Sequence, residues 1–192
     1  MFKKFLFGAI IFFISVAGTA YAREVPIYDY SVEQMIQYTA EDAKEMKFSL
    51  WGKEYYTHSG EKWCRVYFGD SKNNCIYSKL NGNKIQKAWI CISVNNSTNY
   101  AEASKASMKA GMQAGIILGA ILFHTGLTED ECIDVGNKLT KDYYDAINNQ
   151  DPLPENFSKE YSVWCSATAR KMHLNVKGDN SGVTYYIYAS DN

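Results

Sequence analysis

A tight turn signal between two strand-like segments constrains the fold of this 192-residue chain more than any other feature. Asn81-Gly82 is a dipeptide that tolerates the positive φ angles of a two-residue hairpin turn. The segment 75–80 before it has strand composition, and four apolar side chains alternate with other residues in segment 84–94 after it. The pattern predicts an antiparallel hairpin with one face directed at a core.

Three further segments have the composition or alternation of strands, namely 62–68, 161–176 and 183–189. Residues 179–182 form a turn before the last of them. With the hairpin, these segments predict a sheet of about five strands, in which 161–176 is a single long strand.

Two capping-box patterns mark helix starts, because Ser31 is followed by Gln34 and Thr128 by Glu131. The apolar spacing after these positions predicts a helix over 32–47 and another that begins near residue 128. The segment 151–154, Asp-Pro-Leu-Pro, ends the latter helix.

A third helix is predicted over 100–125, which gives the element order α-β-β-β-α-α-β-β. Helices that are grouped apart from antiparallel hairpins indicate an α+β fold. We expect one domain over residues 23–192, with three helices packed on one face of the antiparallel sheet.

The first twenty-two residues have the layout of a secretory signal peptide. Lys3 and Lys4 precede an apolar run from Phe5 to Gly18. Ala20 and Ala22 then supply small residues at the two positions that a signal peptidase reads. The alternative is an uncleaved anchor, but the run is shorter than the roughly 20 residues that a membrane span needs. We therefore expect residues 1–22 to be removed and the mature protein to be periplasmic or secreted. The short basic start is typical of a bacterial leader.

Removal of the leader changes the charge balance. The full chain has 20 basic and 21 acidic side chains, and the loss of Lys3 and Lys4 leaves 18 basic against 21 acidic. This mildly acidic balance argues against a nucleic-acid partner. The hydrophobic content of 46% excludes wholesale disorder.

Five cysteines follow the leader, at positions Cys64, Cys75, Cys91, Cys132 and Cys165. Export favours disulfides, and an odd number leaves at least one thiol. The hairpin would bring Cys75 beside Cys91, and Cys132 with Cys165 would tie a helix to the sheet. Cys64 would then be free. No C-x-x-C pair or Cys/His cluster has the spacing of a metal site, so we expect neither a metal ion nor another cofactor.

Gly111, Gly115 and Gly119 recur every four residues in the apolar helix 100–125. At this spacing they form a narrow stripe against which another backbone can pack closely. Each glycine destabilises a helix interior by roughly 1 kcal/mol relative to alanine, so three of them require a packing reason. We expect this helix to be buried between the sheet and the third helix.

The spacing of these glycines is similar to the glycine zipper of some membrane-associated and pore-forming bacterial proteins. The resemblance implies an alternative in which the helix associates with a membrane. However, the apolar run before His124 is fourteen residues, which is short for a span of about 20.

Tyrosine dominates the aromatic residues of the mature chain, which keeps fourteen of the fifteen tyrosines. Tyrosine and tryptophan join an apolar ring to a polar group, which suits sheet packing and binding surfaces alike. We expect an aromatic sheet face to bind a partner protein or a small ligand. Its candidate residues are Trp51, Tyr55, Tyr56, Trp89, Tyr186 and Tyr188.

Signals for catalysis are few. A hydrolase of the phosphodiesterase or ribonuclease type would need His124 and His173 to converge as an acid–base pair. The sequence has no G-x-S-x-G, H-E-x-x-H or P-loop motif, so we expect no catalytic residues. The sequence favours an exported, non-catalytic binding protein, and an inhibitor or immunity role is compatible with it.

Overall fold

The computed structural model describes residues 23–27, 31–45, 47–93, 100–148, 157–179 and 182–191. The expected leader, residues 1–22, lies outside these residues. The described helices are α2 (Val32–Glu45), α3 (Tyr100–His124) and α4 (Glu129–Asn148). The described strands are β1 (Glu24–Val25), β2 (Leu50–His58), β3 (Glu61–Phe68), β4 (Ser71–Asn81), β5 (Lys84–Ser93), β6 (Phe157–Cys165), β7 (Arg170–Asp179) and β8 (Gly182–Ser190).

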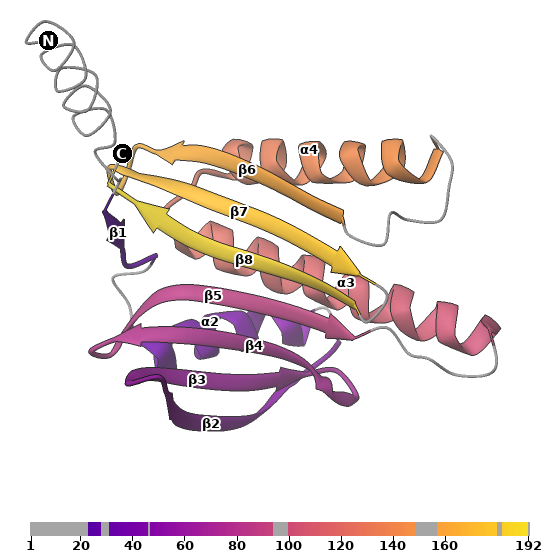
Figure 1. Cartoon of the computed structure of the whole chain (residues 1–192), viewed down its shortest axis with the longest axis horizontal. Coiled ribbons are helices and arrows are strands. Elements are labelled where there is room, and N and C mark those ends of the chain that lie inside the picture. The colour runs from indigo at the N-terminus through magenta and orange to yellow at the C-terminus, as the bar shows by residue number, and fades with distance from the viewer. Residues whose placement is uncertain are drawn as a thin grey trace, which may run out of the picture.

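All eight strands belong to one antiparallel sheet, with the three helices on one side of it (Figure 1). The strand order is β2-β3-β4-β5-β8-β7-β6, and β1 pairs with β8. Two meanders, β2 to β5 and β6 to β8, therefore meet at the β5–β8 pair. The α+β class is confirmed.

The prediction of about five strands is wrong. The edge strand β2 and the short β1 were not predicted, and the segment expected as one strand over 161–176 is divided between β6 and β7. The turn between them contains no glycine or proline, and Ala169 takes the positive φ of 50°. Most of β2 is exposed on both faces, so burial imposes no apolar alternation on its sequence.

Both predicted capping boxes are present. The Gln34 amide donates to Ser31 Oγ over 3.2 Å, and the Ser31 amide donates to Gln34 Oε1 over 2.9 Å. The Thr128 amide donates to a carboxylate oxygen of Glu131 over 2.7 Å, and the return bond is 3.3 Å. Each box satisfies backbone amides that the helix itself leaves without acceptors.

The core lies between the helices and one sheet face. The cross-strand row of Val66, Ile76 and Ile90 faces the helices, and all three side chains are buried. From α3, Ile117 and Ile121 are fully buried in the same cluster. The apolar alternation of β5 therefore faces this core.

The expected burial of the glycine stripe is wrong. Gly115 and Gly119 are exposed, and a Cβ built on any of Gly111, Gly115 or Gly119 would meet no neighbouring atom within 4 Å. The helix α3 instead buries the side that carries Ala114 and Ile117. Because α3 is apolar on several sides, its sequence alone did not indicate which side would face the core.

Large apolar side chains accompany the exposed glycines. Met112 is 66% exposed and Phe123 is 56% exposed. Among the described residues, no helix combines the length and the apolar character required to cross a membrane.

Candidate functional site

The sheet face opposite the helices has no described helix or loop over it (Figure 1). We call it the open face. One row of paired residues crosses seven strands on this face and runs Glu54, Arg65, Tyr77, Trp89, Tyr186, Asn175 and Glu160. The alternation of the pleat therefore gives this face an aromatic centre with charged groups around it.

Trp89 lies at the centre of these aromatic rings. Its ring centroid is 4.7 Å from that of Trp63, 5.4 Å from that of Tyr186 and 6.5 Å from that of Tyr77. The tilted and edge-on arrangements are those that aromatic quadrupoles favour. The cluster forms an aromatic platform across β3, β4, β5 and β8.

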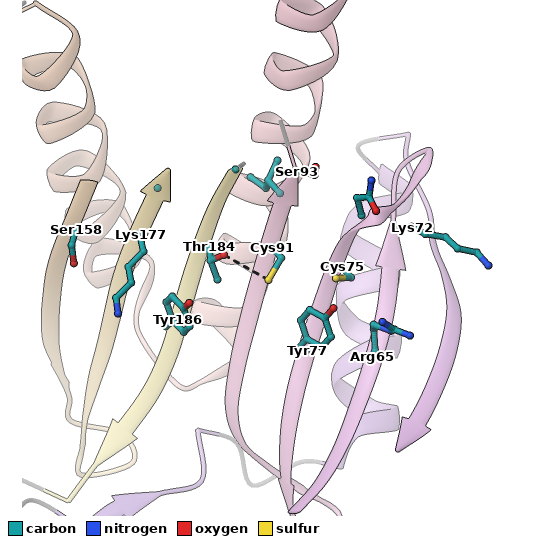
Figure 2. Close-up of a pocket in the computed structure, with 14 residues that line it drawn as sticks. Arg65, Lys72, Cys75, Tyr77, Cys91, Ser93, Ser158, Lys177, Thr184 and Tyr186 are labelled. Atoms are coloured by element: carbon teal, nitrogen blue, oxygen red, sulfur yellow. Dashed lines mark hydrogen bonds between the residues drawn. The ribbon is translucent and has the colours of Figure 1, made fainter. Parts of the chain in front are cut away.

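A shallow hollow of about 850 Å³ lies beside this platform, over β3, β4, β5, β8, β7 and β6 (Figure 2). Three basic side chains line it, Arg65 from β3, Lys72 from β4 and Lys177 from β7. None of the described residues that line the hollow has a carboxylate. The hollow is therefore locally cationic, although residues 23–192 have 18 basic and 21 acidic side chains.

Two of these cations are held by neighbouring groups. Arg65 donates to Glu54 over 2.6 Å, and this bond is the main reason why the pKa of Glu54 lies below its usual value. The Nζ atom of Lys177 lies 5.4 Å from the ring centroid of Tyr186, within the range of a cation–π contact. These contacts hold the Arg65 and Lys177 side chains against neighbouring side chains of the open face.

Several polar atoms buried on the open face have no hydrogen-bond partner within the described part of the chain. They are Trp63 Nε1, Arg65 Nε and Asn175 Oδ1. The buried His173 Nδ1 atom has only a 3.4 Å contact with a Glu160 carboxylate oxygen. Buried polar atoms in folded proteins are almost always satisfied by protein, water or ligand. Their concentration on one face marks it as a surface with unused hydrogen-bonding capacity.

Five of the six predicted aromatic candidates lie on the open face. Trp89, Tyr186 and Tyr188 occupy its central strands, and Trp51 and Tyr56 lie on the edge strand β2. Tyr55 does not belong to this surface, because it points to the helix side and its hydroxyl donates to Glu33 of α2. It faces away from its neighbour Tyr56 because adjacent residues in a strand point to opposite faces.

The sheet register pairs Cys75 directly with Cys91. Burial raises the pKa of the Cys132 thiol, and the charges of Glu131 and Cys165 add to that rise. Cys64 is buried on the helix side, and burial raises its pKa to about 11. All five cysteines are free thiols in this structure, so both disulfides remain predictions.

The two histidines of the hydrolase hypothesis do not converge. His124 stacks on Tyr38 and lies 3.6 Å from Asp42, in the helix layer. His173 stacks on Tyr188 on the open face, across the sheet. Within the described segments, no three His, Cys, Asp or Glu side chains are grouped as metal ligands would be.

Sequence reasoning missed the three cations of the hollow. Arg65, Lys72 and Lys177 are isolated basic residues in three strands, and none belongs to a basic run. Only the pairing of the two meanders through β5 and β8 brings Lys177 onto the same face as Arg65. The signal for Arg65 and Lys177 was the alternation of β3 and β7, in which each of them lies on the face opposite the buried apolar side chains.

Comparison with protein-family models gives no match, and comparisons with curated proteins and with solved structures give none either.

Proposed function

We propose that this protein is an exported, non-catalytic binding protein whose open face takes an anionic group of a small ligand or of a partner protein. The observation that carries the proposal is the hollow, which is lined by cations from three strands and by no carboxylate. Arg65 also pairs with Glu54 outside the lining, so Lys72 and Lys177 are the cations that the proposal relies on most. A phosphate or carboxylate is the natural counterpart of such a surface.

The aromatic platform supports the same role. Tyr77 and Tyr186 line the hollow and contact Trp89, so a ligand with an anionic group and a flat or apolar part would meet both kinds of surface. The volume of about 850 Å³ suits a small molecule or a short peptide segment. The separation of His124 from His173 also favours binding over acid–base chemistry.

The test is a titration of the mature protein, residues 23–192, with inorganic phosphate and with a hexaglutamate peptide. Backbone amide shifts are expected to cluster at Cys91, Thr184 and Lys177, and hexalysine is expected to leave them unchanged. Lys177→Met should weaken binding about tenfold if the lysine supplies roughly 1.4 kcal/mol. Higher salt should weaken binding too, because the lysine is near solvent.

Lys138→Met is the matched control. Lys138 lies on α4, pairs with Asp134 over 2.5 Å and is far from the open face in sequence and in layer. An equal effect of both substitutions, or an absence of binding by either anionic probe, would contradict the proposal.

Membrane-surface association through α3 is a second candidate, and the exposure of Met112 and Phe123 beside the glycine stripe favours it. Apolar side chains on one exposed helix face can enter the headgroup region of a bilayer. Co-sedimentation with phosphatidylglycerol-containing vesicles tests it, and Phe123→Ser should reduce the bound fraction. Tyr55→Ser, at an exposed aromatic in β2, should not change it. Failure of the unaltered protein to sediment with the vesicles would eliminate this candidate.

A further inference from the structure

We infer that Cys75 and Cys91 form a reversible dithiol–disulfide couple at the floor of the hollow, which reacts with small disulfides by thiol–disulfide exchange. This site is independent of which ligand the hollow binds. It differs from a buried structural disulfide because the hollow gives an external reactant access to it.

The register of the sheet provides the geometry for the bond. Cys75 of β4 and Cys91 of β5 are direct cross-strand partners on the open face. Directly opposed residues in antiparallel strands have Cα atoms about 4.5 or 5.5 Å apart, and disulfides accept about 4.4–6.8 Å. The bond can therefore form by side-chain rotation, without displacement of either strand.

The two sulfur atoms differ in access. Both residues line the hollow, but Cys91 is half-buried whereas Cys75 is only 2% exposed (Figure 2). The Thr184 hydroxyl donates to Cys91 Sγ over 3.7 Å and holds that side chain on the open face. An external disulfide therefore meets Cys91 first, and Cys75, beside it on β4, is the resolving thiol.

Cys64 provides an internal comparison. It also lies on a strand that is paired on both sides, but it faces the helices and is 1% exposed. Its cross-strand partners are Tyr55 and Ser78. It has neither access to the hollow nor a cysteine opposite it. Location on a strand is thus not sufficient for the proposed chemistry.

The surroundings of the pair favour a thiolate. The Cys91 thiol donates to Cys75, and with help from Tyr77 and Arg65 this lowers the pKa of Cys75 to about 7. The same bond raises the pKa of Cys91. This interaction lets the pair lose one of its two protons more readily than an isolated buried thiol does, so a Cys75 thiolate can act as the base for Cys91.

The exchange begins with a Cys91 thiol and a Cys75 thiolate. The Cys91 sulfur attacks one sulfur of the external disulfide while its proton passes to the Cys75 thiolate, and one external thiolate leaves. That leaving thiolate takes the proton from Cys75, and the Cys75 thiolate attacks the Cys91 sulfur. The Cys75–Cys91 bond forms and the second external thiolate departs. Two protein sulfurs are oxidised, and the external disulfide is reduced to one thiol and one thiolate.

The test uses mature protein equilibrated with mixtures of oxidised and reduced glutathione, quenched with iodoacetamide and digested with trypsin. The expected product joins the peptide 73–79, which contains Cys75, to the peptide 88–105, which contains Cys91. It should lack two hydrogens relative to the reduced peptides and should appear and disappear with the glutathione ratio. Peptide 63–65, with Cys64, should be recovered with its thiol alkylated after unfolding.

Two single variants distinguish the roles of the thiols. Cys75→Ser should accumulate glutathione on Cys91, because no resolving thiol remains, whereas Cys91→Ser should acquire no comparable adduct on Cys75. Cys64→Ser is the control and should leave the linked peptides unchanged. The inference is overturned if Cys75 and Cys91 remain fully alkylated at every ratio, if the bond forms but no glutathione ratio reduces it, or if Cys64 is the partner found.

Discussion

The imidazole of His173 lies flat on the ring of Tyr188, with the ring centroids 4.6 Å apart and the planes inclined by 3°. Its Nε2 atom is 3.0 Å from Ser190 Oγ, and its Nδ1 atom is 3.4 Å from a carboxylate oxygen of Glu160. Burial is the largest influence on this group and lowers its pKa below 6.5, although Glu160 acts in the opposite direction. The folded protein therefore favours the neutral ring.

This pKa shift predicts a loss of stability in mild acid. Well above pH 6.5 the folded and unfolded states both hold neutral imidazole, so the shift has no effect there. As the pH falls below that value, the unfolded chain takes up the proton more readily, and the free energy of unfolding decreases. We expect the free energy of unfolding of His173→Gln, measured with urea, to decrease less between about pH 7 and pH 5 than that of the unaltered protein.

His58→Gln is the control for this measurement, since His58 is exposed near the end of β2. It should retain the pH dependence of the unaltered protein. An identical pH dependence in His173→Gln would show that the ring does not contribute.

The exposed glycines of α3 predict stabilisation by alanine. Because a Cβ at Gly115 or Gly119 would meet no atom within 4 Å, alanine should gain its helix propensity at no steric cost. Each substitution should raise the free energy of unfolding by up to about 1 kcal/mol. Thermal and urea unfolding would measure this gain. A loss of stability would instead indicate that the glycine stripe packs against another backbone in solution.

Gly182→Ala is the control for these substitutions, because alanine should lower the free energy of unfolding there. A Cβ there would lie 2.0 Å from the carbonyl oxygen of Ile92, at the β5–β8 junction that joins the two meanders. We expect strong destabilisation or failure to fold.

The helix caps predict separate and similar losses. Ser31→Ala and Thr128→Ala each remove a side-chain acceptor for a backbone amide at a helix start. Each should lower the free energy of unfolding by about 1 kcal/mol. Ser49→Ala, at an exposed position in the connection before β2, should change stability by less than about 0.5 kcal/mol. Equal values for all three variants would contradict the capping argument.

A hydrogen bond between α4 and β6 predicts a local effect. The Tyr161 hydroxyl donates to an Asp142 carboxylate oxygen over 2.7 Å. Tyr161→Phe should lower stability by about 1 kcal/mol and increase hydrogen exchange in α4. Tyr56→Phe, at an exposed ring on the edge strand, should leave α4 protection unchanged. Unchanged exchange in both variants would mean that the bond does not hold α4 to the sheet.

The hairpin between β4 and β5 and the starts of α2 and α4 were predictable because their signals lie within a few residues of each feature. Asn81-Gly82 marked the hairpin between β4 and β5, but Asn81 pairs with Lys84, so the turn residues are Gly82 and Asn83. A register irregularity between Lys79 and Leu80 then places Cys75 opposite Cys91, whereas a two-residue turn at Asn81-Gly82 would pair it with Ala88. Ser31 and Thr128 begin their helices for reasons contained within four residues of each position. In contrast, the turn between β6 and β7 has no glycine or proline to mark it, and β2 lacks the alternation that burial imposes.

The sequence by itself determined the helix starts, the central hairpin and which side chains alternate along each strand, because these depend on neighbours a few residues apart. Only the tertiary structure decided that α3 turns its glycines outward, and that Arg65, Lys72 and Lys177 line one hollow. Those outcomes depend on how α3 packs against the sheet and on the pairing of β5 with β8. The residues that pair between these two strands are about a hundred positions apart in the sequence. Contacts of that range follow from packing of the whole core, and no local sequence pattern specifies them.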